Sequence, residues 1–262
     1  HYTYEAGERL IAEVEAANFG KRNIEGVFCW TLAGKKSVSE NGNCEPAEIK
    51  SKNTVIATGE DTEITICRPG SYTEVGSLDI PLDFVEKNTA LTLKVRIGDS
   101  ISAYPIWVYR KTTPVCPENV YETRAFDVKT REILQNGGRV YLSPDADKES
   151  LPNSIKTQFT TDFHTDWQWW IMATKRAVIL PHPMKTIITE MDSYAFLRPM
   201  AQMIEFRCLK GKVLLSTMEL HKSQQYPEVR ALQASIYTYL SGENFEPAEE
   251  ITEEELSMLV RG

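Results

Sequence analysis

The chain has 262 residues, of which 42% are hydrophobic and 25% charged, as in folded globular proteins and unlike disordered or fibrous ones. The formal charge is −8 and no run of Lys and Arg exceeds a pair, so nucleic acid is not an expected partner. No apolar run reaches the roughly 18 residues that a membrane span requires. The five cysteines are too scattered for a disulfide framework, although a single disulfide bond in the first domain stays an alternative.

Short β-rich runs separated by turn residues predict an all-β sandwich over residues 1–112. The alternation is clearest over Thr89–Ile97, where apolar residues take every second position near its end, as a half-buried strand requires. Gly98-Asp99 then supplies the turn chemistry of a hairpin. The expected strands are Leu10–Ala17, Gly26–Leu32, Thr54–Ala57, Glu63–Cys67, Gly76–Ile80, Thr89–Ile97 and Ala103–Tyr109.

The strand pattern stops at the proline-containing segment 111–117, where we place a domain boundary. A short β run near Val120, a helical stretch Asp127–Gln135 closed by Gly137-Gly138, and a strand over Arg139–Ser143 follow. This succession of strand, helix and strand has an α/β rhythm. We therefore expect an α/β domain over residues 118–242.

Later elements support a sheet covered by helices. A helix is expected from Pro227 to Gly242, because its apolar residues recur at three- and four-residue spacing. The acidic tail, residues 243–262, contains a capping-box start at Thr252 and should form a short docked helix. The other expected elements are a helix over Asp166–Lys175, a strand over Ala177–Leu180 and a hairpin of Met203–Cys208 with Lys212–Ser216.

Three of the five tryptophans fall within four residues, in the most unusual stretch of the sequence. Indole rings stack on the apolar faces of sugars while nearby polar side chains bond to hydroxyl groups, so carbohydrate binding is one interpretation. Packing in the core or at a domain interface is the other, because large aromatic side chains are commonly buried. The candidate residues are His164, Asp166, Trp167, Gln168, Trp169 and Trp170.

The sequence provides no complete set of catalytic or metal-binding residues. The histidines, at positions 1, 164, 182 and 221, lack the spacing of a metal motif, and we expect neither metal nor cofactor. Neither Cys116 nor Cys208 has the glycine-flanked setting of a nucleophile elbow. A pair of carboxylates could serve as acid and base, although acidic loop residues are usually solvated. The candidates are Asp145, Asp147, Asp162 and Asp166.

Several segments resemble large glycoside hydrolase family two proteins (β-galactosidase-like) of Bacteroides-type bacteria. Tyr4–Gly20 and Val27–Leu32 resemble a β-sandwich accessory domain of these proteins, which implies an immunoglobulin-like fold. The second half is similar to their C-terminal module, which implies a flavodoxin or glutamine-amidotransferase-like α/β domain. The segments that carry this second resemblance are Leu134–Leu142, Phe159–Phe163, His164–Trp170 and Gly211–Leu215.

The sequence departs from that family pattern at one junction, because Phe163 adjoins His164 where family members have an intervening stretch. The region from Pro117 to Val120 looks shortened in the same way. The family's catalytic glutamates lie in a (β/α)₈ barrel of about 250 residues, and no such barrel fits beside these domains. The resemblance therefore transfers no catalytic residue to this chain.

The first hypothesis is a non-catalytic accessory part of an exported β-glycosidase that acts on β-linked glycans. It would support architecture, oligomerisation or substrate access. The partners implied are a glycan, the catalytic barrel of the parent chain and a second copy, in the periplasm or outside the cell. The alternative is a carbohydrate-binding module built on Trp167, Trp169 and Trp170. A small hydrolase using Asp or His side chains is a third hypothesis.

Overall fold

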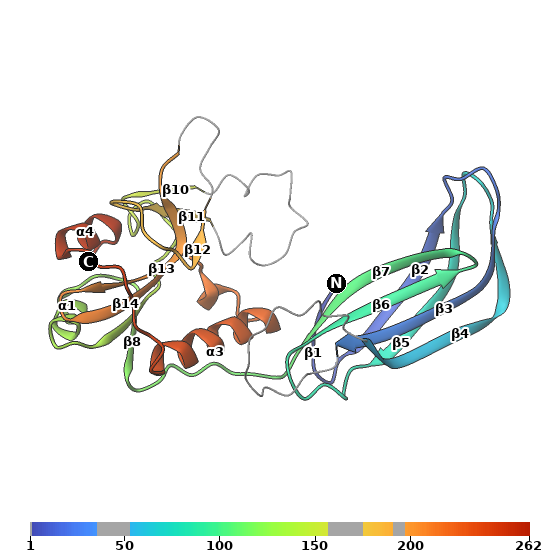
Figure 1. Cartoon of the computed structure of the whole chain (residues 1–262), viewed down its shortest axis with the longest axis horizontal. Coiled ribbons are helices and arrows are strands. Elements are labelled where there is room, and N and C mark those ends of the chain that lie inside the picture. Colours follow the sequence, from blue (N-terminus) through green and yellow to red (C-terminus); the bar gives the residue numbers. More distant parts are fainter. Residues whose placement is uncertain (1, 36–52, 157–174, 191–196) are drawn as a thin grey trace, which may run out of the picture. The chain divides into compact units, whose positions relative to one another are not determined.

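The computed structural model describes residues 2–35, 53–156, 175–190 and 197–262. The chain divides into two compact units, His1–Lys111 and Thr112–Gly262, drawn in Figure 1. Each unit has a hydrophobic core of its own. No helix in the described ranges has the length and apolar character needed to cross a bilayer.

The first unit is all β in its described residues and contains two sheets. The larger sheet has the strand order β1-β7-β6-β3-β4, and the smaller one consists of β2 and β5 (Figure 1). The strands are β1 (Thr3–Glu5), β2 (Arg9–Ala17), β3 (Ile24–Lys35), β4 (Asn53–Cys67), β5 (Tyr72–Pro81), β6 (Thr89–Ile97) and β7 (Ser100–Tyr109).

Side-chain alternation places the core of this unit between the two sheets. In β6, Leu91, Leu93, Val95 and Ile97 are buried while the residues between them are exposed or half-buried. They join buried residues of β2 and β5 in one cluster. The predicted turn at Gly98 connects β6 to β7. Its φ of +53° favours glycine, and a Cβ there would lie 2.5 Å from the carbonyl oxygen of Glu25.

One long strand replaces two of the predicted short ones. The runs Thr54–Ala57 and Glu63–Cys67 both belong to β4, which pairs antiparallel with β3 through two register irregularities. Gly59, which lies between these two runs, packs over the Trp30 ring. A Cβ on Gly59 would lie 2.4 Å from Trp30 Nε1, so this glycine permits close packing within a continuous strand.

The second unit is organised around one mixed sheet with the order β10-β11-β13-β14-β9-β8, and β12 also pairs with β13. Strands β8, β9 and β14 are mutually parallel, and the remaining pairs are antiparallel. The strands are β8 (Val120–Thr123), β9 (Arg139–Leu142), β10 (Ser154–Lys156), β11 (Arg176–Ile179), β12 (Ile188–Thr189), β13 (Met200–Cys208) and β14 (Gly211–Ser216).

Helices cover both faces of this sheet. In β14, Val213 and Leu215 contribute to a core that includes α1 (Val128–Gln135) and α4 (Glu253–Leu259), while Leu214 faces α3 (Pro227–Ser241). The α4 helix begins with a complete capping box between Thr252 and Glu255. A short 3₁₀ turn, η3 (Leu220–Lys222), precedes α3.

The predicted fold class, an immunoglobulin-like sandwich followed by a flavodoxin or glutamine-amidotransferase-like α/β domain, is wrong. The described chain is mostly β-sheet, arranged in three sheets with few helices. The α/β rhythm that suggested the second half comes from the single β8-α1-β9 crossover. The strands after β9 pair with one another antiparallel, including the β13–β14 hairpin across Leu209 and Lys210 that the sequence did predict, and β14 also pairs parallel with β9.

Candidate functional site

The predicted carbohydrate-binding residues lie outside the described residues, so the glycan interpretation stays a prediction. The six carbohydrate-binding candidates are His164, Asp166, Trp167, Gln168, Trp169 and Trp170. Asp162 also lies outside the described residues, as does the predicted helix over Asp166–Lys175 apart from Lys175 itself. Among the described residues, no group of three or more His, Cys, Asp or Glu side chains could hold a metal ion.

The structure separates the two remaining aspartate candidates. Asp147 accepts a hydrogen bond from the amide of Ser150 at 2.6 Å, which is a local turn contact. Asp145 instead joins a polar network, and His221 lies in the same network. The other candidate histidine with a described position, His182, is exposed.

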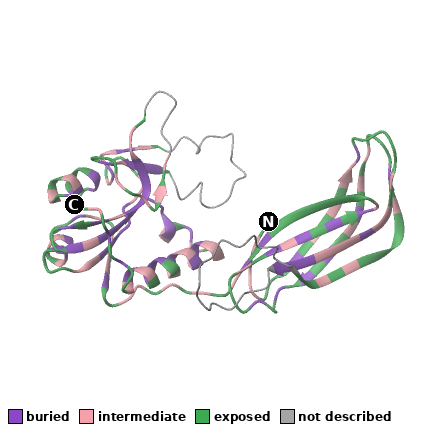
Figure 2. Ribbon diagram, viewed as in Figure 1, coloured by how far each residue is buried: buried purple, intermediate pink, exposed green. Residues whose placement is uncertain are grey.

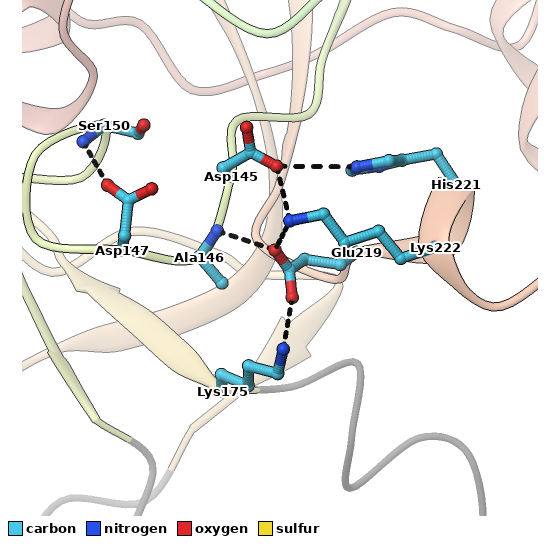
Figure 3. A network of polar contacts seen from close by, with 8 residues as sticks. All are labelled: Asp145, Ala146, Asp147, Ser150, Lys175, Glu219, His221 and Lys222. Carbon is cyan, nitrogen blue, oxygen red and sulfur yellow. Dashed lines mark hydrogen bonds and ion pairs between the residues drawn. The ribbon is translucent and has the colours of Figure 1, made fainter.

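This network forms where the parallel strands end. Asp145 follows β9, and Glu219, His221 and Lys222 follow β14, whose Leu215 pairs with Leu142 of β9. The carboxyl ends of adjacent parallel strands meet at one edge, which is where α/β sheets commonly bind ligands. Lys175 reaches the same place from the start of β11, and Figure 3 shows these side chains pointing toward one another.

Glu219 is the centre of the network. Its carboxylate accepts a hydrogen bond from Lys222, an ion-pair contact from Lys175 at 3.0 Å, and the amide hydrogen of Ala146 at 3.2 Å. Lys222 also lies 2.7 Å from Asp145 Oδ1. The Glu219 side chain is 4% exposed, whereas those of Lys175 and Lys222 are 54% and 48% exposed. The lysines therefore cover a buried carboxylate.

Electrostatics keep both carboxyl groups ionised. The hydrogen bond from Lys222 lowers the pKa of Asp145 despite some burial. Burial by itself would raise the pKa of Glu219, but hydrogen bonds from Lys222 and Lys175 outweigh it, and the pKa is lowered. Burial, followed by the charge of Arg124, lowers the pKa of His221, so its imidazole is neutral near pH 7.

The network has the location of an active site, and its contacts join three segments of the second unit. A general acid needs a carboxyl whose pKa is raised, and here the pKa values of both are lowered. His221 Nε2 lies 3.5 Å from Asp145 Oδ1, which is too long for a strong hydrogen bond. The contacts tie the loops after β9 and β14 to the start of β11. The sequence missed Glu219 and Lys175, since only strand register brings them together.

A second candidate site lies along the open side of the first unit. Within the described residues, β2 pairs with β5 alone, so its other edge carries unpaired backbone groups. The amide of Leu82 donates to the carbonyl of Glu8 at 2.9 Å, and Pro81, which has no amide hydrogen, lies opposite Arg9. Antiparallel pairing alternates, so the amides of Arg9, Ile11 and Glu13 face the open edge.

The facing edge of the larger sheet differs. Strand β7 pairs with β1 only over Trp107–Tyr109, where the Trp107 amide donates to the Tyr2 carbonyl at 2.8 Å. The remaining edge contains Pro105, which cannot donate a hydrogen bond and protects an edge against pairing. Figure 2 shows β7 exposed along most of its length. The β2 edge therefore lacks the proline that protects the β7 edge.

A groove runs between these two edges. Its main section, of about 320 Å³, is lined by Leu10, Ala12 and Val14 on the β2 side and by Leu93 and Tyr104 on the floor. A second section, of about 190 Å³, continues it toward the far end of β2. The two sections share four lining residues, namely Val14, Glu15, Val95 and Tyr104.

The floor of this groove is an inward-facing sheet surface that no described strand covers. Ser100, Ser102 and Tyr104 share the face of the buried Ile106 in β7, yet all three are exposed. Tyr104 stacks on Tyr2, with ring centroids 6.3 Å apart. The sequence did not reveal this site, because the assignment of β2 and β5 to a separate two-stranded sheet cannot be deduced from strand patterns.

Comparisons with known proteins give matches to two sequence families and to solved structures. Residues 152–261 match a domain of unknown function (DUF8487), and residues 47–110 match another (DUF8488). A comparison with curated proteins gives no match. The crystal structure of Spo0M, a sporulation control protein from Bacillus subtilis, is 12% identical, with 92% of this chain and 95% of that chain covered. The TM-score is 0.31, which is too low to indicate a shared fold.

These findings correct the resemblance drawn from the sequence. The two families that match the chain are domains of unknown function and neither is a glycoside hydrolase or glutamine amidotransferase family, so the identification with a Bacteroides-type family two protein is wrong. Tyr4–Gly20 and Val27–Leu32, which carried half of the resemblance, are strands with adjoining turns, a pattern shared by many β proteins. Part of the other half, Phe159–Trp170, lies outside the described residues.

Proposed function

We propose that this chain is a non-catalytic binding module whose first unit takes up an extended polypeptide segment beside β2. The segment would become the third strand of the smaller sheet and lie over the exposed inner face of β7. Extended peptides bind sheet edges in this way, with backbone hydrogen bonds providing affinity and side-chain pockets providing specificity.

The single observation that carries the proposal is the combination of an unpaired β2 edge with an adjoining groove. An unpaired edge alone is common, and proteins usually protect it with proline, charge or a covering element. Here the protective Pro105 is on β7, while the described β2 edge has no proline and its charged residues, Arg9, Glu13 and Glu15, lie on the outward face only. The exposed floor residues Ser102 and Tyr104 are those that a strand beside β2 would cover.

Binding of a labelled peptide to the full chain tests this proposal. The probe is a peptide of about nine residues, the length of β2, that alternates valine with lysine. Fluorescence anisotropy should show saturable binding. N-methylation of alternate peptide amides on the pairing edge should abolish it, because those amides would donate to β2 carbonyls.

Two substitutions at one exposed position separate edge pairing from other contacts. Ile11, which is 66% exposed, presents its amide to the open edge. Ile11→Thr keeps that amide, whereas Ile11→Pro removes it without removing a bond to β5. We expect Ile11→Pro to bind about tenfold more weakly than Ile11→Thr, as for one lost hydrogen bond. Equal binding by both variants, with both folded by circular dichroism, would refute strand addition.

A further inference from the structure

The outward face of the smaller sheet is acidic where it borders the open edge. Across β2 and β5, Arg9 is the one basic residue, against Glu13, Glu15, Glu74 and Asp79. Arg9 is already paired with Asp79 at 2.7 Å. The excess negative charge therefore lies toward the C-terminal end of β2.

Neighbours on β5 do not neutralise these carboxylates. Glu13 lies opposite Ser77, and Glu15 lies opposite Glu74, so two like charges face each other across the strands. Directly opposite like charges destabilise a sheet, and opposite charges stabilise it. Glu13 and Glu15 also line the groove, so a strand added beside β2 would place its outward side chains next to them.

The inward face of the site requires different chemistry. Ala12 and Val14 of β2 and Leu93 and Val95 of β6 provide apolar lining, while Ser102 adds a hydroxyl group on the floor. Side chains of an added strand alternate between its two faces. Its inward residues would therefore be apolar and of moderate size, and its outward residues would meet Glu13 and Glu15.

A second copy of this chain does not fit this position through its own β2. In each copy, β6 and β7 form the floor beside β2. If the β2 edges of two copies paired, β6 and β7 of the second copy would enter the space that β7 of the first copy occupies. A single strand carries no such floor, so the groove favours one extended segment.

We propose that the occupant is an extended segment that alternates apolar residues with Lys or Arg, with the basic side chains paired to Glu13 and Glu15. This inference rests on the proposed function, because it specifies the partner of the same site. The charge complementarity selects among extended segments, and the open backbone edge allows any of them to pair.

Three peptides of equal length test the charge preference on the full chain. They alternate valine with lysine, with threonine or with glutamate. The valine–lysine peptide should bind most tightly and the valine–glutamate peptide most weakly. Equal or tighter binding of the threonine or glutamate peptide, with sensitivity to Ile11→Pro, would overturn this inference while leaving strand addition intact.

Substitutions then assign the preference to particular carboxylates. Glu13→Gln and Glu15→Gln should each weaken binding of the valine–lysine peptide about two- to fivefold, as expected for one cross-strand ion pair, and should leave the valine–threonine peptide unchanged. Glu63→Gln is the matched control, because Glu63 is exposed on β4, at the opposite edge of the larger sheet.

The outcomes separate the two proposals. An equal effect of Glu63→Gln and Glu13→Gln would mean that overall charge, and not this site, attracts the peptide, which contradicts the inference. Binding of the valine–lysine peptide that is unaffected by Ile11→Pro, or no binding by any of the three peptides, contradicts the proposed function itself.

Discussion

Replacing Glu219 by glutamine tests whether the polar network of the second unit is a structural joint. The substitution keeps the shape of the side chain but removes its charge, and it places an amide donor among lysine donors. Removing one member of a buried ion pair costs about 3–5 kcal/mol. Lys175 and Lys222 are about half exposed and can turn toward water, so we discount this to about 2 kcal/mol.

Scanning calorimetry of the full chain provides the measurement. For a unit of this size, a loss of about 2 kcal/mol lowers the Tm by about 4–8 °C. Glu132→Gln is the control, since Glu132 is exposed on α1 in the same unit. The variant Leu93→Ala, in the core of the first unit, identifies which transition belongs to which unit. A Tm for Glu219→Gln within 1–2 °C of the Glu132→Gln value would refute the hypothesis that the network is a structural joint.

The stability of the second unit should depend on pH through the polar network and on the Thr252 cap of the terminal helix α4. The pKa of His221 is lowered by burial and then by Arg124, so stability should begin to fall once the unfolded histidine gains a proton, below about pH 6.5. The pKa values of Asp145 and Glu219 are also lowered, so their stabilisation is present above about pH 4 and lost below it. Urea unfolding from pH 7 to pH 3 checks both windows, and a His221→Gln variant with an unchanged slope between pH 6.5 and 5 would contradict the first. Thr252→Ala removes the capping box of α4 and should cost about 1 kcal/mol, whereas the same loss for Ser257→Ala would show that the cap is not responsible.

Local pattern predicts those elements whose signals lie within a few residues. The alternation in β6, the β13–β14 hairpin and the α3 stripe with Pro227 at its start all appear in the structure where the sequence suggests them. The capping box at Thr252 likewise forms. These features depend on side-chain periodicity and on turn or cap residues, which are local properties of the chain.

Strand partners are not local, and the residue pattern of a strand does not predict them. One βαβ crossover suggested a whole α/β domain, but whether the next strand adds parallel or antiparallel depends on the sheet that is already formed. Gly59, which lies between two predicted short strands, packs against Trp30 across the sheet and lets β4 run through. The same limit applies to both sites, since Glu219 meets Asp145 through the register of β14 with β9.

Hydrogen exchange at β2 tests strand addition most directly. In the free chain, the amides of Ile11 and Glu13 should exchange rapidly, while those of Ala12 and Val14, which face β5, should be protected. Saturating valine–lysine peptide should slow exchange at Ile11 and Glu13 and leave Ile64 of β4 unchanged. Protection of Ile11 and Glu13 already present in the free chain, or no slowing with the peptide bound, would contradict the account.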